Sequence, residues 1–506
     1  MTTAPPEDRR AARASRSVAP NVLTLDPPSA WWRYRAPQLA ALGAIAVLAF
    51  FWLGRGLPPL PWMASDSASY LEFSPVRPHG YAWFLAAYRL VFDDLAYLPA
   101  VQLALYVGAV WLLAAAIGRR TRSFGAAAAV AVLAYFATDT TEFPYILSDS
   151  LYAAALIAGI ACFLLYIDSR RPGLLLLAGG AIGLAICFRV IGLALLPGLA
   201  VAVLLDRGAR RVGLVRAVVL TALPIVLFCG AAASSQLLHH GRFGLGSWGG
   251  MDVLGKLPLL SRSVPEDGGL ARLNPILDQM QPAREQLTRL NPLLEALAAR
   301  QYYDHLRWEV VVPELERSWP EWREGDEHRR GRLAAKLATA YIAEDPLGFL
   351  RRTMIDLLGL WAMPRWLTEA EYDAASAQLE AIGELPFLSA FARTPEGQLD
   401  YYKIVPDPSD PVRIIVFRVG VLAFWGLSLG VIALAATRRG RRGLSLAPDL
   451  VLIVLVVHGV YAATALMEGV YARYIMPTWP LLVAGPILAL GLLLRARRNA
   501  ISMARN

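Results

Sequence analysis

About ten apolar runs, separated by short polar loops, constrain the fold of this chain more than any other feature. A run of about 17 to 25 apolar residues is long enough to cross a bilayer as a helix. Because lipid offers no hydrogen-bond partners, each such segment must satisfy its own backbone polar groups, which a helix does. We therefore predict an all-α polytopic membrane protein with about ten spans. The runs lie near residues 36–54, 95–117, 123–138, 149–167, 172–188, 190–205, 213–233, 413–436, 449–467 and 475–494, of which the third and the sixth are short.

The composition agrees with a membrane protein. The chain is 56% hydrophobic and only 18% charged, and its mean hydropathy is +0.44, which is more apolar surface than a soluble fold can bury. A formal charge of +9 would suggest a nucleic-acid partner for a soluble chain, but here the arginines lie in short clusters between the apolar runs. All three cysteines lie inside apolar runs, which indicates buried small residues and not disulfides.

The arginine clusters predict the orientation. They follow every even-numbered run, so by the positive-inside rule these loops and both termini are expected to be cytoplasmic. A chain rich in Arg, Ala and Leu with few lysines is typical of a GC-rich bacterial genome, which predicts a multi-pass protein of the bacterial inner (plasma) membrane. The clusters are Arg119, Arg120 and Arg122; Arg170 and Arg171; Arg207, Arg210 and Arg211; Arg438, Arg439, Arg441 and Arg442; and Arg495, Arg497 and Arg498.

The same pattern divides the chain into parts. The polar N-terminus is predicted to be a disordered tail, and amphipathic stretches punctuated by Pro and Gly predict a mostly helical extracytoplasmic domain between two membrane modules. The parts are a cytoplasmic tail (1–35), a module of seven spans (36–233) with a first outer loop (55–94), the extracytoplasmic domain (234–411), a module of three spans (412–494) and a second cytoplasmic tail (495–506).

Two aspartates recur in similar strings on the predicted outer face. Asp66 lies in SDSASY within the first outer loop, and Asp149 lies in SDSLY where the fourth run begins. Carboxylates at a membrane edge are candidate general bases. Each aspartate could instead be a helix N-cap, a position that Asp favours. The likeness of the two strings favours a shared site, with Glu72 as a reserve candidate for the base.

Arg189 and Arg473 are candidate ligands for an anion. Arg189 lies between two apolar runs in a loop too short to expose it fully, where a charge costs about 2.5–3.5 kcal/mol on insertion scales. An ion-pair partner, a ligand or snorkelling to the headgroups would each account for it. Arg473 lies between two tyrosines at the start of the last run and is either a ligand contact or an interfacial anchor.

Other polar residues of the outer face are weaker candidates. Arg77 and His79 follow Pro75 in the first loop and are either solvated or accessory to the site, as is Tyr70. The chain has no Walker loop, no GxGxxG after a strand and no DxD-type metal motif. No soluble nucleotide donor, metal site or cofactor is therefore assigned, and a divalent metal is compatible with the motifs without being indicated by them.

Several strings resemble landmarks of a known superfamily. SDSASYLEFSPVRPHGYAWFLAAYRL resembles the first periplasmic loop of the GT-C membrane glycosyltransferases, especially the bacterial protein mannosyltransferase and aminoarabinose transferase relatives. SDSLYAAAL, FRVIGLALLPG, AEDPLGFLRRTMIDLLGLW and YARYIMPTWPLLVAG are similar to later landmarks. The resemblance covers roughly 36–233 and 413–494. The chain departs from it in one respect: many members carry two adjacent acidic residues in this loop, whereas Ser67 follows Asp66 and the adjacent pair Asp93 and Asp94 lies further along.

The resemblance implies a GT-C-type bundle and an inverting transfer of a sugar from a polyprenyl-phosphate donor to a glycan, lipid or protein acceptor on the extracytoplasmic face. It implies that Asp66 is the base, that Asp149 is a second acidic site residue, and that Arg189 and Arg473 contact the donor phosphate, with Arg77 as a third candidate. Two alternatives remain open: a transporter or flippase of a lipid-linked sugar, and an O-antigen ligase-like enzyme that uses a diphosphate-linked donor.

Overall fold

The computed structural model describes residues 28–92, 94–138, 140, 142–206, 213–265, 270–362, 411–437, 447–469 and 472–505. In these ranges every regular element is a helix, and the one strand-like contact is a parallel bridge between Trp62 and Tyr145. By its internal contacts the chain divides into two units, residues 1–41 and 42–506. Both hydrophobic cores and the candidate site lie in the second unit.

Seven helices are long and apolar enough to cross a membrane. The prediction of a helical polytopic membrane protein is therefore confirmed, whereas a count of ten spans is not established. Three further apolar helices of 10–17 residues correspond to the third, fifth and sixth predicted runs: α6 (Phe124–Phe136), α8 (Gly173–Phe188) and η1 with α9 (Val190–Leu205). The seven long helices are α2 (Pro28–Leu53), α5 (Leu98–Thr121), α7 (Asp149–Ser169), α11 (Leu214–His240), α22 (Pro411–Ala436), α24 (Pro448–Met467) and the continuous stretch of α25 (Ala472–Ile475), η6 (Met476–Thr478) and α26 (Trp479–Arg505).

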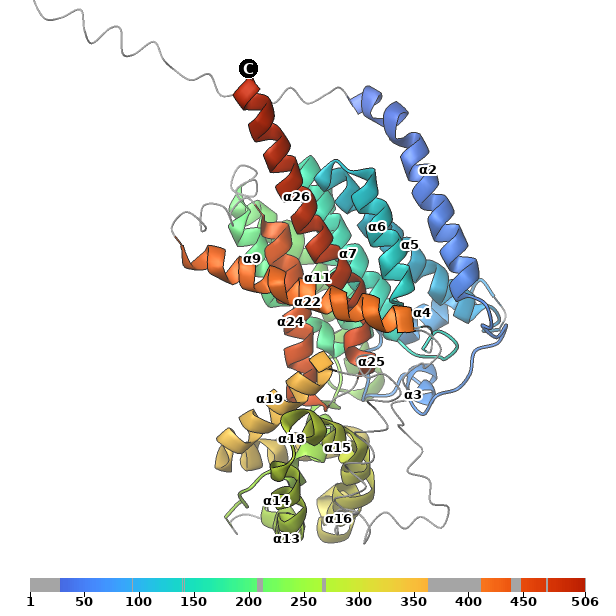
Figure 1. Cartoon of the computed structure of the whole chain (residues 1–506). Helices are drawn as coiled ribbons and strands as arrows, with labels where there is room; N and C mark the ends of the chain where they lie inside the picture. The colour runs from blue at the N-terminus through green and yellow to red at the C-terminus, as the bar shows by residue number, and fades with distance from the viewer. Residues whose placement is uncertain are drawn as a thin grey trace, which may run out of the picture. The chain divides into compact units, whose positions relative to one another are not determined.

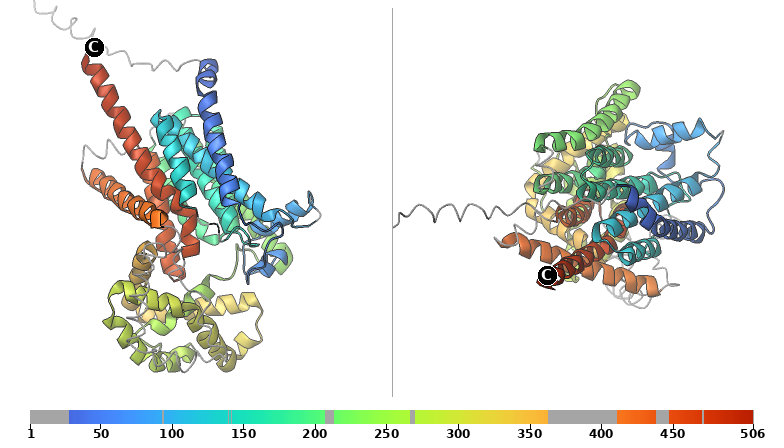
Figure 2. Two further views of the ribbon diagram at one scale, coloured as in Figure 1. Left: turned by 45° about the vertical axis from the view of Figure 1, so that its right-hand side comes forward. Right: turned by 90° about the horizontal axis from the view of Figure 1, so that it is seen from above.

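Helix α7 is the most enclosed of the long helices, with 83% of its apolar window buried. It packs between α5 and α8, and α8 packs in turn on α11 (Figures 1 and 2). Small residues allow these helices to approach closely, as is usual where helices associate in lipid. A Cβ on Gly179 would lie 2.1 Å from the carbonyl oxygen of Thr221, so α8 and α11 meet at backbone distance there.

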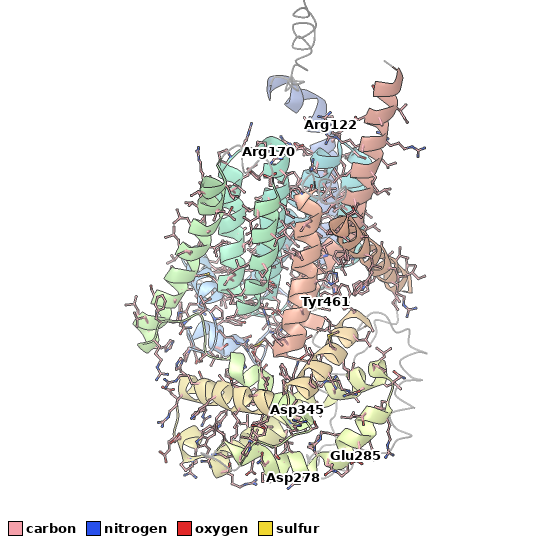
Figure 3. The ribbon with its side chains drawn as sticks, turned by 90° about the vertical axis from the view of Figure 1, so that its left-hand side faces the viewer. Arg122, Arg170, Asp278, Glu285, Asp345 and Tyr461 are labelled. Atoms are coloured by element: carbon pink, nitrogen blue, oxygen red, sulfur yellow. The ribbon has the colours of Figure 1, made fainter. Side chains whose placement is uncertain are left out.

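Three arginine–aspartate pairs mark one end of the bundle. At the end we call the inner end, Arg120 pairs with Asp449 at 2.7 Å, Arg170 pairs with Asp206 at 2.6 Å, and Arg119 pairs with Asp168. Asp168 is at the last turn of α7 and Asp149 is its first residue, so these aspartates lie roughly 30 Å apart. Figure 3 shows Arg122 and Arg170 at this inner end, and Tyr461 of α24 far from them. The opposite end, which carries Asp149, is called the outer end below.

The inner end therefore gathers the arginine clusters that the positive-inside rule predicts to be cytoplasmic, as far as the described residues extend. Arg495 joins them, because its Nη1 donates to the carbonyl oxygen of Arg120 at 2.8 Å. The predicted clusters at 207–211 and 438–442 and most of the predicted N-terminal tail lie outside the described residues. Which end faces the cytoplasm stays a prediction.

A second group of helices follows α11 and has its own hydrophobic core, which includes Leu254, Trp322 and Tyr341. Helix α11 runs seven residues past the predicted limit of 233 and ends at Gly241, whose φ of 69° suits a left-handed cap. Residues 363–410 of the predicted domain lie outside the described residues. The helices are α12 (Gly249–Val253), η2 (Leu254–Leu259), η3 (Ala271–Leu273), α13 (Asn274–Gln279), α14 (Gln281–Arg289), α15 (Pro292–His305), η4 (Leu306–Val311), α16 (Val312–Ser318), α17 (Pro320–Arg323), α18 (Glu327–Glu344) and α19 (Pro346–Ala362).

Candidate functional site

Two aspartates and three arginines from separate parts of the chain meet at the outer end of the bundle. Asp66 Oδ1 lies 2.8 Å from Arg77 Nη2, and Asp66 Oδ2 lies 2.9 Å from Arg473 Nη2. Arg473 Nε lies 3.2 Å from Asp149 Oδ2, and Arg189 Nη1 donates to Asp149 Oδ1. These five residues, called the Asp–Arg cluster below, form one continuous chain of ion pairs from Arg77 to Arg189.

The first outer loop reaches Asp149 because it docks on residues 144–146, which precede α7. Trp62 N donates to Pro144 O at 2.7 Å, and Ile146 N donates to Trp62 O at 3.1 Å. Ser67 Oγ then donates to Ile146 O at 3.0 Å, which fixes the start of the short helix α3 (Ser67–Leu71). These hydrogen bonds hold the residues just before the two Asp-containing strings against each other.

The capping alternative is wrong for Asp66. This residue precedes α3, yet its side chain makes no capping hydrogen bond and is occupied by the two guanidinium groups. Asp149 is the first residue of α7, where a negative charge is favourable to the helix dipole. Its carboxylate also binds Arg189 and Arg473, so the dipole and the ion pairs act together.

Arg189 is buried within the protein and paired with Asp149. It occupies an extended position (φ −149°, ψ 129°) between α8 and η1, which interrupts the helix and turns the side chain toward Asp149. The side chain is 8% exposed and its guanidinium carbon lies 4.2 Å from the centre of the Tyr474 ring. A buried, paired and stacked guanidinium keeps its charge in a fixed position.

Asp66 is ionised in this setting. Burial opposes its ionisation, but the neighbouring Arg77 and Arg473 guanidinium groups outweigh burial and hold the pKa of Asp66 below its usual value. Arg77 Nε is buried and has no hydrogen-bond partner in the described part of the chain. Arg77, which already contacts Asp66 through Nη2, therefore has a second N–H group that could donate a hydrogen bond to a ligand.

Not every predicted site residue joins the cluster. Tyr70 borders it: its hydroxyl lies 2.9 Å from Ser148 Oγ, and Arg77 lies 5.9 Å from its ring centre. Glu72 is exposed at the end of α3. Asp94 caps its own turn by accepting from Ala96 N, while Asp93 lies outside the described residues.

His79 belongs to a separate group. It is buried, its Nδ1 lies 2.8 Å from Ser235 Oγ, and its ring packs against those of His239 and His240 at the end of α11. Gln236 of the same helix donates to Arg77 O at 2.7 Å. This histidine group therefore supports the loop that carries Arg77, and His79 has no place in the cluster itself.

Acidification between pH 6.5 and about 4 is expected to destabilise the protein through His79. Burial, together with the His239 and His240 rings, lowers the pKa of His79 from 6.5 to about 4. The folded state then binds fewer protons than the unfolded chain in this window, so stability is complete above pH 6.5 and falls as the pH drops. The unfolding temperature across the window measures this, and His79→Gln should flatten the dependence; an unchanged slope would assign it to other groups.

Four residues near the cluster were not foreseen from the sequence. Tyr474 stacks on Arg189, and Glu142 Oε2 lies 4.0 Å from Arg473 Nε. Asp252 of α12 lies 3.3 Å from Arg307 of η4. Tyr474 could have been predicted to lie near the site, because it is adjacent to Arg473 in the sequence. Asp252 and Arg307 could not, because no sequence pattern indicates which of the outer helices pack near the cluster.

The described residues contain no group of three or more His, Cys, Asp or Glu side chains that could hold a metal ion. Searches of family models, curated proteins and solved structures found no match to this chain. The site is consequently interpreted from its own geometry, and the resemblance to the GT-C glycosyltransferases remains an expectation drawn from sequence motifs.

Proposed function

We propose that this protein is an inverting glycosyltransferase that moves a sugar from a polyprenyl-phosphate donor to an acceptor on the extracytoplasmic face of the membrane. The observation that carries the proposal is the Asp–Arg cluster: an ionised carboxylate and three guanidinium groups at the outer end of the bundle. These are the two kinds of group that such a transfer needs, a proton acceptor and a phosphate clamp.

The charge of the cluster suits an anionic ligand. Three arginines share Asp66 and Asp149, while a third carboxylate, Glu142, lies 4.0 Å from Arg473, beyond hydrogen-bond distance. The planar fork of arginine matches phosphate oxygens and remains charged when it is partly desolvated. A lipid phosphate that entered the cluster would compete with Asp66 and Asp149 for the guanidinium groups of Arg473 and Arg189.

That competition couples donor binding to the strength of the base. In the free protein the arginines keep the pKa of Asp66 low, so it is a weak proton acceptor. When the donor phosphate draws Arg473 away, Asp66 loses a counter-ion and its affinity for a proton rises. The base would then reach its working strength only when the donor is present.

In the transfer step, Asp66 takes the proton of an acceptor hydroxyl while the hydroxyl oxygen forms a bond to the anomeric carbon. The bond from that carbon to the donor phosphate oxygen breaks, and the phosphate departs with the electron pair. Arg189, Arg473 and Arg77 offset the charge that develops on it. The lipid phosphate is already an anion and leaves without a general acid, and attack from the opposite side inverts the anomeric centre.

The decisive experiment incubates the purified full-length protein with a panel of polyprenyl-phosphate sugars and measures release of free polyprenyl phosphate. Release that increases with an added acceptor is the expected result. A flippase would move the lipid without breaking this bond, and a ligase-like enzyme would release polyprenyl diphosphate from the corresponding donor. Either of those outcomes rejects the proposal.

Arg189→Lys is expected to raise the KM for the donor about tenfold, which corresponds to about 1.4 kcal/mol. Lysine keeps the charge that Asp149 needs, but loses the fork that would hold two phosphate oxygens. The matched control is Arg170→Lys, which alters an arginine–aspartate pair at the inner end. Equal donor KM values for the two variants would reject the phosphate role of Arg189.

A further inference from the structure

We propose that Trp248, Trp308, Asp252 and Arg307 form a binding subsite for a neutral carbohydrate beside the Asp–Arg cluster. The inference rests on the proposed function in that the bound carbohydrate would be the acceptor. No motif of the sequence pointed to these residues. They come from the loop before α12, from α12 itself and from η4.

The two tryptophans provide an aromatic surface. Their ring centres lie 5.8 Å apart with 38° between the ring planes, and Trp308 is 38% exposed. Arg307 lies over the Trp308 ring with its guanidinium carbon 5.0 Å from the ring centre. Sugar rings have an apolar face of C–H groups that can lie on such a surface, while their hydroxyls require polar partners at the edge.

Asp252 and Arg307 supply those polar partners. Asp252 Oδ1 lies 3.3 Å from Arg307 Nη1, and the two side chains are 18% and 10% exposed. A carboxylate offers only acceptors and a guanidinium only donors, so the pair can bind neighbouring hydroxyls from both sides. Aromatic rings flanked by a few fixed planar polar groups are typical of small-ligand sites in proteins.

The backbone holds these side chains in place. Arg307 and Trp308 lie in η4, a π-helical segment between α15 and α16. Such segments are rare in proteins as a whole, and many of those that occur lie at functional sites. On the other side, a Cβ on Gly250 would lie 2.3 Å from Ala335 N, and one on Gly331 would lie 2.1 Å from Ser247 O. The turn that carries Trp248 is thus pressed against the backbone of α18.

Arg77 connects the subsite to the proposed base. Its guanidinium carbon lies 5.9 Å from the Trp248 ring centre, and its Nη2 lies 2.8 Å from Asp66. The Arg77 guanidinium would therefore lie between Asp66 and a sugar ring bound on the tryptophans. This side of Asp66 is distinct from the side that faces Arg473, Asp149 and Arg189, where the donor phosphate is proposed to bind.

The local charge favours a neutral ligand. Asp252 and Arg307 form an ion pair at 3.3 Å, so together they carry no net charge that would attract a uronic acid or a phosphorylated sugar. Hydroxyl groups need no such attraction and can hydrogen-bond to a carboxyl in either protonation state.

The test uses the full-length protein in lipid nanodiscs on an array of neutral and uronic-acid oligosaccharides. The wild type is expected to bind at least one neutral oligosaccharide, Trp308→Ala to reduce that signal at least tenfold, and Trp308→Phe to retain most of it. Trp425→Ala is the matched control, since Trp425 is 39% exposed and lies on α22, outside the subsite. Circular dichroism of each variant confirms folding.

Three outcomes would overturn the subsite: no neutral oligosaccharide bound, equal binding of uronic acids, or a Trp308→Ala signal equal to that of Trp425→Ala. Quenching of Trp248 and Trp308 fluorescence by brominated lipids would also overturn it, by identifying the pair as a membrane-interface belt. Release of free polyprenyl phosphate by the wild type, measured with and without acceptor, tests the transferase separately. No release under either condition, with intact oligosaccharide binding, rejects the transferase alone. Release without any oligosaccharide binding rejects the subsite alone.

Discussion

Asp66→Asn is expected to lower the rate of sugar transfer by about 10²–10⁴-fold, the usual contribution of a positioned general base. Asparagine has nearly the same shape but cannot take up the acceptor proton. It also removes the charge that competes for Arg77 and Arg473, so binding of the anionic donor should be as tight as in the wild type or tighter. The measurement is kcat for polyprenyl phosphate release together with donor affinity.

The comparison variant is Glu72→Gln, which changes an exposed carboxylate a few residues away in the same loop. It should transfer sugar at close to the wild-type rate, because Glu72 lies outside the Asp–Arg cluster. Full activity in Asp66→Asn with a large loss in Glu72→Gln would move the base to Glu72. Equal losses in both would indicate that the loop, not one carboxylate, is required.

Asp356→Ala is expected to cost about 3–5 kcal/mol of folding free energy, the usual result when one partner of a buried ion pair is removed. Asp356 lies 3.0 Å from Lys256 Nζ and 2.6 Å from Arg352 Nη2, and all three side chains are at most 4% exposed. Burial lowers the pKa of Lys256 and the Asp356 charge opposes that effect. Without Asp356, Lys256 would lose its carboxylate partner, and Arg352 would keep only Glu295, which lies 3.4 Å away and already pairs with Arg351.

This network also joins the outer helices to the membrane module, since Lys256 Nζ donates to Ala465 O of α24. Asp356→Ala should therefore lower the unfolding temperature of the purified protein sharply. Glu314→Ala is the control, because it breaks an exposed ion pair with Arg317, for which a loss of at most about 1 kcal/mol is expected. Similar losses in the two variants would mean that water reaches the Asp356 network and screens it.

The membrane helices illustrate how far local pattern carries. The fourth predicted run, 149–167, matches α7 at Asp149–Ser169 almost residue for residue, because apolar length and the helix boundary coincide there. The seventh run underestimates α11, since the helix continues to His240 after the apolar pattern has ended and stops only at Gly241. Hydropathy reports the part of a helix that lies in lipid, and not where the helix itself ends.

The candidate site shows a different limit. The alternation of arginine-rich loops indicated that Asp66, Asp149, Arg189 and Arg473 share one end of the bundle. It did not indicate that Arg473 contacts Asp66 across 407 positions of the chain, or that His79 lies apart with His239 and His240. Contacts at such separation depend on how the helices pack, for which a single sequence carries no local signal.

The class of the protein, the position of most spans and the end of the bundle at which the charged candidates gather could be predicted from the sequence alone. These follow from the cost of apolar surface in water and of charge in lipid, which act on each segment independently. The pairing of particular carboxylates with particular arginines, and the approach of Trp248, Asp252 and Arg307 to the cluster, became visible only in the folded chain. Those outcomes depend on close packing between distant segments, where a shift of about an ångström makes or breaks a hydrogen bond.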